Sequence, residues 1–385
     1  MTGKRLIVEN FAQIRTVDIE FGDLTVLVGA QGTGKSIVLQ WLKAALDHGE
    51  IVAALQGAGH DVRGPDGSAL IDLIFGVGMA PGWSDGHSRV VFDGKALTFS
   101  RLRRRTPVTT GRAFFVPAHR AMLISDGWAA PFQKLSAETP VVARLFSQRL
   151  FELFSGRVED ELFPVERLLK GEYRELLNAA VFHGGHVKLE MERHAYRLKL
   201  THGKSDLPLM TWSSGQREFT PLLLGLYDVL PPRKQQKHPH IDWIIVEEPE
   251  MGLHPQAISV FMLLVLDLLW RKYNVVLSTH SPLILDVIWM MKRLQEISAG
   301  EKYVCDAFGV EHTQAVRKVA QVALSKSFKT YLLAFGSDSQ VTSTDISQLD
   351  PGAENLEEAG WGGLTGFSTR FGDVVRAAAN EADRR

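Results

Sequence analysis

The stretch with the clearest chemistry is residues 29–36, which read Gly-Ala-Gln-Gly-Thr-Gly-Lys-Ser. It follows an apolar run at 24–28, predicted to be a buried parallel strand, and precedes a predicted helix at 37–46. In this context the glycines allow backbone amides and the helix N-terminus to surround the phosphates of ATP, Lys35 reaches the β and γ phosphates, and Ser36 binds Mg²⁺. The residues predicted to bind the cofactors here are Gly29, Gly32, Gly34, Lys35 and Ser36.

Two adjacent carboxylates, Glu247 and Glu248, follow a second apolar run at 242–246. Ligands of open α/β sheets bind where strands end, and successive side chains of a strand point in opposite directions. The two glutamates therefore need different roles. We predict that Glu247 belongs to the magnesium shell and that Glu248 acts on the attacking water as a general base or orienter.

His280 ends a third apolar run, at 274–279, and Pro282 suits the first turn of a following helix. A lone histidine at a strand end is often structural. Because this one lies about thirty residues after the acidic pair, on what is predicted to be the next strand, it is predicted to contact the γ phosphate and to be catalytic.

A second anion site is predicted at residues 213–218, which read Ser-Ser-Gly-Gln-Arg-Glu before an apolar helix at 219–230. Free amides, a hydroxyl and the positive end of the helix dipole favour an anion there. Since the chain has one phosphate loop, the extra site is best explained if it faces the ATP of a partner chain. The alternative for Ser213, Gly215 and Gln216 is an ordinary helix cap.

In their order along the chain, the four elements resemble the ATP-binding-cassette (ABC) ATPases, and specifically the branch that contains RecF, Rad50 and the heads of structural-maintenance-of-chromosomes (SMC) proteins. Residues 9–11 (Glu-Asn-Phe) and 250–255 (Glu-Met-Gly-Leu-His-Pro) are similar to segments of that branch. Residues 115–120 (Phe-Val-Pro-Ala-His-Arg) are similar to a segment of its smaller prokaryotic members.

The resemblance implies a head-to-tail homodimer, at minimum, that sandwiches two ATP molecules. Ser213 and Gly215 would contact the γ phosphate held by the other subunit's Lys35. The family usually has aspartate where this chain has Glu247, and the additional methylene is expected to alter magnesium geometry and slow turnover. Gln133 is a candidate for the family's magnesium-contacting glutamine, with a solvated helix end as the alternative. Arg120 is a candidate contact of a phosphate or of the signature helix.

The composition favours a cytoplasmic α/β protein. The chain has 385 residues, is 45% hydrophobic and carries a net charge of −1, which excludes a strongly basic coat for nucleic acid. The single cysteine excludes a disulfide framework. We expect no signal peptide and no membrane association, because the apolar helix predicted at 257–270 is too short to span a bilayer.

The predicted fold class is α/β: an ABC-ATPase head with a P-loop core sheet, flanking helices and an antiparallel β subdomain, plus an inserted helical lobe. The head's N-terminal half is placed at 1–120, the lobe at 121–185, and the C-terminal half with its tail at 186–385. No heptad repeat is long enough for a coiled-coil arm, so the lobe is predicted to be compact. It could also build oligomers larger than a dimer.

What the ATPase controls is left with several alternatives. The chain is similar to stand-alone ATPase subunits that prokaryotes encode beside a separate nuclease or toxin, as in the Septu and PARIS antiphage systems, and no acidic cluster is spaced like an appended nuclease centre. A DNA-repair or chromosome-maintenance ATPase that acts directly on DNA is the second hypothesis. A transporter subunit fits less well, and a non-hydrolysing nucleotide scaffold is the remaining alternative. The basic residues Arg101, Arg103, Arg104 and Arg105 could contact DNA, contact an acidic partner, or form a solvated hairpin edge.

Overall fold

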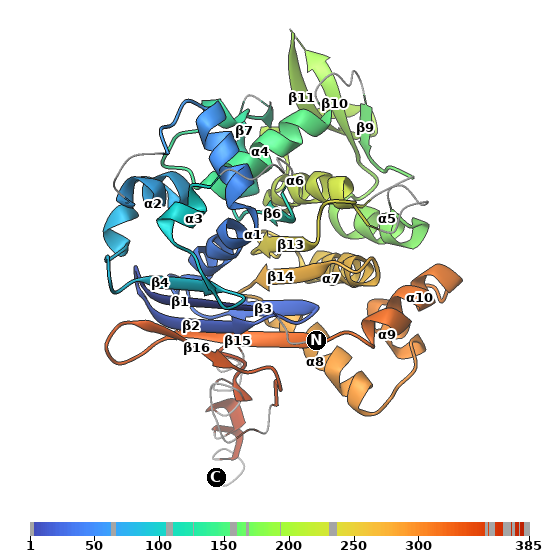
Figure 1. Cartoon of the computed structure of the whole chain (residues 1–385). Coiled ribbons are helices and arrows are strands. Elements are labelled where there is room, and N and C mark those ends of the chain that lie inside the picture. Colours follow the sequence, from blue (N-terminus) through green and yellow to red (C-terminus); the bar gives the residue numbers. More distant parts are fainter. Residues whose placement is uncertain are drawn as a thin grey trace.

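The computed structural model describes residues 4–62, 67–104, 111–125, 127–154, 160–166, 169–192, 194–230, 237–350, 353, 359–364, 371, 374–376 and 378–380. Its centre is a ten-stranded mixed sheet (Figure 1). In spatial order the strands are β5 (Lys95–Ala96), β4 (Arg89–Phe92), β1 (Arg5–Phe11), β2 (Ile14–Glu20), β16 (Val341–Asp345), β15 (Phe328–Phe335), β3 (Leu24–Val28), β14 (Asn274–Ser278), β13 (Trp243–Glu247) and β6 (Ala113–Val116).

The five strands from β15 to β6 run parallel, whereas β1 pairs antiparallel with β2 and β4. All five side chains of β3 and of β13 are buried, as expected for a parallel sheet covered on both faces. Alternate residues join different cores: Ile244 and Val246 of β13 pack on one side of the sheet, and Trp243 and Ile245 on the other. The predicted α/β fold class is confirmed.

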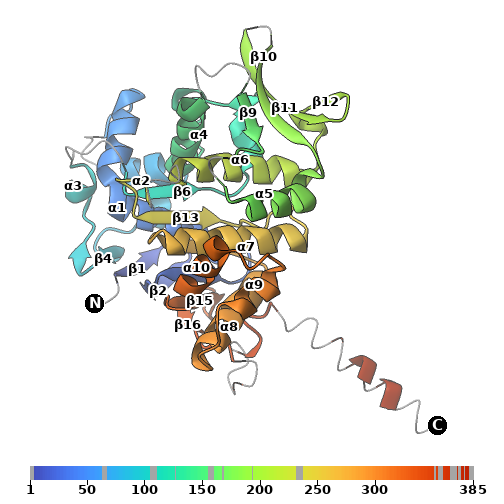
Figure 2. The same cartoon turned by 90° about the vertical axis from the view of Figure 1, so that its right-hand side faces the viewer.

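Helices cover both faces of the sheet (Figure 2). The side that holds Trp243 and Ile245 packs against α1 (Lys35–Gly57) and α2 (Ser68–Phe75), with α3 (Phe99–Leu102) nearby. The side that holds Ile244 packs against α5 (Gly171–Leu177), α6 (Ser214–Val229), α7 (Pro255–Trp270), α8 (Pro282–Glu296), α9 (Lys302–Phe308) and α10 (Gln314–Ala323). Helix α4 (Val141–Phe154) contributes to both cores. Short helical turns are η1 (Ala80–Gly82), η2 (Arg120–Leu123), η3 (Phe132–Lys134), η4 (Asn178–Phe182) and η5 (Leu209–Thr211).

A smaller antiparallel sheet has the order β12 (Ser205–Pro208), β11 (Ala195–His202), β10 (His186–Glu192) and β9 (Asp160–Phe163). Its β10–β11 hairpin projects from the top of the molecule, away from β15 and β16 (Figure 1). A third pair is β7 (Ile124–Ser125) with β8 (Trp128–Ala129). Strand β9 lies in the predicted lobe and pairs with β10 of the predicted C-terminal half. The division at 121 and 186 stays a prediction.

Several local predictions can be compared with the structure. Asp93 and Gly94 form the turn of the β4–β5 hairpin. The helix after the phosphate loop extends to Gly57, eleven residues past the predicted end at 46, although its backbone is not helical at Asp47. Arg101 lies in α3 and not on a hairpin edge, and Arg105 lies outside the described residues. Among the described helices, none combines the length and apolar character that crossing a bilayer requires.

Candidate nucleotide-binding site

The predicted motifs meet at one edge of the parallel sheet. Register pairs Glu247 of β13 with Ser278 of β14, and Ser278 with Leu27 of β3. The residues that follow these three strands are therefore neighbours, because parallel strands end at the same edge. This edge, which we call the nucleotide edge, brings together the phosphate loop, the acidic pair and His280.

The phosphate loop leads directly into α1. Gly29 has φ 148°, and a Cβ there would lie 2.2 Å from the Leu333 carbonyl oxygen of β15, so a larger residue would separate the loop from the sheet. The Lys35 ammonium donates to the carbonyl oxygens of Gly29 (2.9 Å) and Ala30 (3.0 Å). Burial lowers the pKa of Lys35 to about 8, although the charges of Glu248 and Glu250 oppose the shift. A cation held here with little water is suited to phosphate oxygens.

Glu247 has the properties expected of a ligand for a hard cation. Its carboxylate is 4% exposed and accepts a hydrogen bond from the Ala118 amide at 3.0 Å, while Oε1 is buried without a partner among the described residues. Burial raises the pKa of Glu247 to about 7, although bonds from Ala118 and the Ser36 hydroxyl oppose this. The Glu247 carboxylate and the Ser36 hydroxyl are oxygen ligands beside the phosphate loop, and ligands of this kind fit Mg²⁺.

Glu248 and His280 face each other, with 3.3 Å between the carboxylate Oε1 and the imidazole Nε2. Both side chains are partly exposed, at 29% and 28%. Glu248 has φ 40°, an uncommon conformation for a residue other than glycine, and its amide donates to the Ser278 carbonyl at 2.9 Å. Because it is 29% exposed, the Glu248 carboxylate is accessible to water.

Sequence reasoning missed the role of Glu250, which lies two residues after the acidic pair. Its Oε1 accepts from the Thr279 hydroxyl (2.8 Å) and from the His280 amide (2.6 Å). Its Oε2 is buried and has no partner among the described residues. Glu250 thus fixes the backbone that carries His280, and the third carboxylate in Glu-Glu-Pro-Glu was the available signal.

Arg120 connects this edge to the helix that carries the second predicted anion site. Its guanidinium is completely buried. Nε donates to the Glu218 carbonyl of α6 at 3.1 Å. Nη1 donates to the carbonyls of Pro117 (3.1 Å) and Glu247 (2.9 Å), and Nη2 to that of Glu248 (3.2 Å). Of the two predicted contacts, the one with the signature helix is therefore confirmed.

Ser213, Gly215 and Gln216 lie together at the start of α6. Ser213 and Gln216 form a reciprocal capping box, and Gln216 also donates to the Val181 carbonyl at 3.0 Å. A Cβ on Gly215 would lie 2.7 Å from the Gly252 carbonyl oxygen, so this glycine lets the helix start pack against the loop after β13. The helix cap that the sequence left open is present, while the Ser213 and Ser214 side chains are exposed. Among the described residues, no polar contact joins them to the phosphate loop.

Gln133 is not at the nucleotide edge. It lies in η3 and lines a cavity together with Glu50 and Gly57 of α1. Glu50 is fifteen residues from Lys35 along that helix, about 22 Å at 1.5 Å per residue. Of the two alternatives for Gln133, the contact with magnesium at Ser36 is wrong, because Gln133 lines a cavity beside the far half of α1. Gln133 is exposed, as the alternative of a solvated position predicts.

The chain is similar to several known proteins. A family model described as an AAA domain, putative AbiEii toxin, Type IV TA system, matches residues 130–286. A curated relative, the OLD nuclease of Thermus scotoductus, is 24% identical over an alignment of 328 positions, which covers 74% of this chain and 60% of the relative. The chain therefore spans about three fifths of the relative's length.

Similar solved structures are more distant. An SMC head bound to the C-winged helix domain of ScpA has a TM-score of 0.42 at 13% identity, and covers 89% of this chain and 96% of that one. The SMC head of Thermotoga maritima has a TM-score of 0.35 at 14% identity, with 90% and 99% covered. The similarity to ATPases rests instead on the phosphate loop within the parallel sheet, the family match and the curated relative. In the order and placement of its motifs the chain is similar to ABC-type ATPases of the RecF, Rad50 and SMC branch.

Proposed function

We propose that this ATPase is a switch: two copies close around two ATP molecules, and closure controls a separate effector in prokaryotic defence against phage. The observation that carries the proposal is the exposed cap of α6. Ser213 and Ser214 present a hydroxyl-rich helix start to solvent, while the cap is tied through Arg120 to the backbone of Glu248. When the cap binds the γ phosphate of the partner's ATP, this connection would affect the position of Glu248 in the chain that carries the cap.

The residues at the sheet edge divide the chemistry. Lys35 and the loop amides bind the triphosphate, and Ser36 with Glu247 would hold Mg²⁺. A bound Mg²⁺ would neutralise part of the negative charge of the phosphates. Glu248 orients the attacking water or accepts its proton, and His280 lies 3.3 Å from that carboxylate, in reach of the γ phosphate. Glu247 in place of aspartate favours slow turnover, which suits a switch.

The proposed effector is a nuclease or toxin. It is supported by the description of the matching family model, which names a toxin of a toxin–antitoxin system, and by the name of the relative, OLD nuclease. The role in phage defence extends the similarity to the Septu and PARIS subunits.

The test is ATP-dependent assembly of Glu248→Gln compared with wild type. Glutamine keeps the size of the side chain but cannot accept a proton, so turnover should fall by a factor of about 10² to 10⁴ and ATP-bound dimers should accumulate. Turnover is measured by phosphate release, and mass by light scattering with ATP and Mg²⁺. Wild-type turnover in the variant would show that the catalytic assignment is wrong.

Ser213→Arg tests the partner-facing role of the α6 cap. The added cation and bulk should block the paired state while leaving ATP binding to the same chain intact. Ser325→Arg is the matched control, because Ser325 is an exposed serine after α10. Dimers of Ser213→Arg with ATP, as abundant as those of the control, would contradict closure through this cap.

Direct action on DNA is the second candidate function. It is favoured by the name of the curated relative, a nuclease, and by the basic residues Arg101 and Arg104 at α3. ATP turnover measured with and without duplex DNA separates the two functions. Turnover raised at least about tenfold by DNA would favour the DNA-acting ATPase, whereas turnover indifferent to DNA favours a switch that awaits a protein partner.

A further inference from the structure

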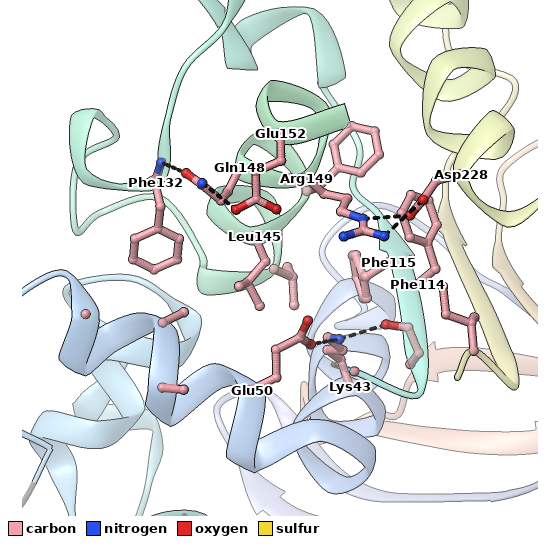
Figure 3. A pocket seen from close by; sticks show the side chains of 18 of the residues that line it. Lys43, Glu50, Phe114, Phe115, Phe132, Leu145, Gln148, Arg149, Glu152 and Asp228 are labelled. Atoms are coloured by element: carbon pink, nitrogen blue, oxygen red, sulfur yellow. Dashed lines mark hydrogen bonds and ion pairs between the residues drawn. The ribbon is translucent and has the colours of Figure 1, made fainter. Parts of the chain in front are cut away.

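A cavity of about 430 Å³ lies at the edge of the parallel sheet opposite the nucleotide edge (Figure 3). Its walls come from the second half of α1, from β6, η3 and α4, and from the end of α6. Ala113, the first residue of β6, and Ile241, just before β13, line it. The catalytic residues follow the opposite ends of these strands, so the cavity and the nucleotide site are separate.

One wall of the cavity is apolar and aromatic. Phe114, Phe115, Phe132 and Leu145 point into it (Figure 3). Pockets for small organic ligands have volumes of about 300 to 1,000 Å³ and are lined mainly by such side chains. The size and this wall are suited to the body of a small organic molecule.

The inner polar group of the cavity, Lys43, is already saturated. Its ammonium donates to Asp47 (2.7 Å), to Glu50 (2.5 Å) and to the Ala113 carbonyl oxygen (2.7 Å). Three acceptors use all three N–H bonds of a lysine. Lys43 therefore has no donor left for a ligand, and two carboxylates share its single charge.

The outer polar groups carry a further negative charge. Arg149 binds both oxygens of Asp228, at 2.7 and 3.0 Å, which pairs those two charges. The Glu152 carboxylate accepts only a neutral donor, the Gln148 amide, at 2.7 Å among the described residues. Among the side chains that line the cavity, the carboxylates of Glu50, Glu152 and Asp228 thus outnumber the cations Lys43 and Arg149 by one. Just outside the lining, Asp47 on Lys43 adds one carboxylate, and Arg144, 3.9 Å from the Phe132 ring centre, adds one cation.

We infer that the cavity binds a small organic cation: an amine whose aromatic or aliphatic body packs on Phe114, Phe115 and Phe132, and whose ammonium faces Glu152 and Glu50. A cation compensates the surplus of carboxylates, and burial of its apolar body against the aromatic wall supplies the remaining affinity. An anion of the same shape would meet the surplus charge and be rejected.

Calorimetric titration with three molecules of one shape tests this inference. Tryptamine is a cation, tryptophol is neutral and indole-3-acetate is an anion. Tryptamine should bind about tenfold more tightly than tryptophol, the factor expected from two partly exposed charge pairs, and indole-3-acetate should bind least. Equal affinity for tryptamine and indole-3-acetate, or no heat with millimolar tryptamine, would overturn the inference.

Variants then locate the binding. A Cβ on Gly57, at the end of α1, would enter open space, so Gly57→Leu should fill the mouth of the cavity and abolish binding while the protein stays folded. Glu152→Gln should weaken tryptamine about threefold to fivefold and leave tryptophol unchanged. Glu296→Gln, on the surface of α8, and Lys35→Ala, in the nucleotide site, should both bind tryptamine as wild type does. Tryptamine binding that Gly57→Leu leaves intact, or that Lys35→Ala removes, would place it elsewhere.

Discussion

The two ends of the same parallel strands are built differently. At the nucleotide edge, Glu247 Oε1 and Glu250 Oε2 are buried without partners among the described residues, and Glu248 has a positive φ. At the opposite edge, the Asp47 carboxylate accepts from Lys43, from the Arg112 amide (2.7 Å) and from the Ala113 amide (2.8 Å). The buried carboxylate oxygens at the nucleotide edge thus include two without hydrogen-bond partners, whereas the buried Asp47 carboxylate at the opposite edge has its partners.

The difference separates groups that bind ligands from groups that hold the fold. Buried polar atoms without partners and strained backbone are uncommon, and they gather where a ligand or a reaction uses them. The saturated cluster of Lys43 and Asp47 instead ties α1, at the point where its backbone departs from helical geometry, to the start of β6. Changes at this cluster should therefore affect stability, and changes at the nucleotide edge should affect turnover.

The largest effect is expected for Lys43→Met. The change leaves the buried Asp47 and the partly exposed Glu50 without a cation. Loss of one partner of a buried ion pair typically costs about 3–5 kcal/mol of unfolding free energy. Urea unfolding followed by circular dichroism measures this. The double variant Lys43→Met, Glu50→Gln should recover part of the loss, because one uncompensated charge is removed. A loss below about 1 kcal/mol would remove the contrast between the two edges.

The nucleotide edge could be predicted because its signals are local in the sequence. The glycine spacing, the apolar runs of β13 and β14 and the polar residues after each run specify a strand end without any knowledge of the fold. Parallel pairing then brings Glu248 and His280 to 3.3 Å. The α/β class followed from the same runs.

The opposite edge and the cross-links could not be predicted in this way. Lys43 and Asp47 are spaced as an ordinary i,i+4 pair on a helix surface, and only the packing of β6 against α1 buries them. Arg120 connects α6 to β13 through four backbone carbonyls, which leave no trace in the sequence. Gln133 was misplaced for the same reason, since a lone glutamine carries no information about its neighbours.

An intermediate effect is expected at Glu250, which holds the backbone that carries His280. Glu250→Ala removes the hydrogen bonds from the Thr279 hydroxyl and from the His280 amide. Because misplacement of a catalytic group by about 1 Å can lower the rate up to about 100-fold, kcat should fall about 10- to 100-fold. Glu250→Gln keeps an acceptor oxygen and should restore most of the rate. Steady-state kinetics measures both variants.

The pattern that identifies a positioning role for Glu250 is loss of kcat with little change in KM, rescued by glutamine. Thermal unfolding serves as the control, since a variant that merely loosens the fold lowers Tm as well. Unchanged kcat in Glu250→Ala, or equal loss in the alanine and glutamine variants, would contradict this role.

The smallest effect is expected from the protonation of Lys35. Its pKa is lowered to about 8 by burial, so the ammonium loses its proton as the pH rises through 8, and the protonated form is the one that attracts phosphate oxygens. Affinity for ATP is therefore full well below pH 8 and falls as the pH rises through 8. Between pH 7.5 and 8.7 the Kd should rise about fivefold, as a single titration near 8 requires.

This pH range avoids the other titrating groups, because Glu247, with a pKa of about 7, is largely ionised above 7.5, as is the terminal phosphate. Fluorescence titration with a labelled ATP analogue measures Kd at each pH. Lys35→Arg is the control, since a guanidinium keeps its charge throughout and its Kd should not vary with pH. A wild-type Kd that does not change up to pH 9 would mean that Lys35 keeps its proton, because the loop stabilises the ammonium by more than burial destabilises it. Lys35 would then be held as Lys43 is at the opposite edge, and the contrast between the two edges would be lost.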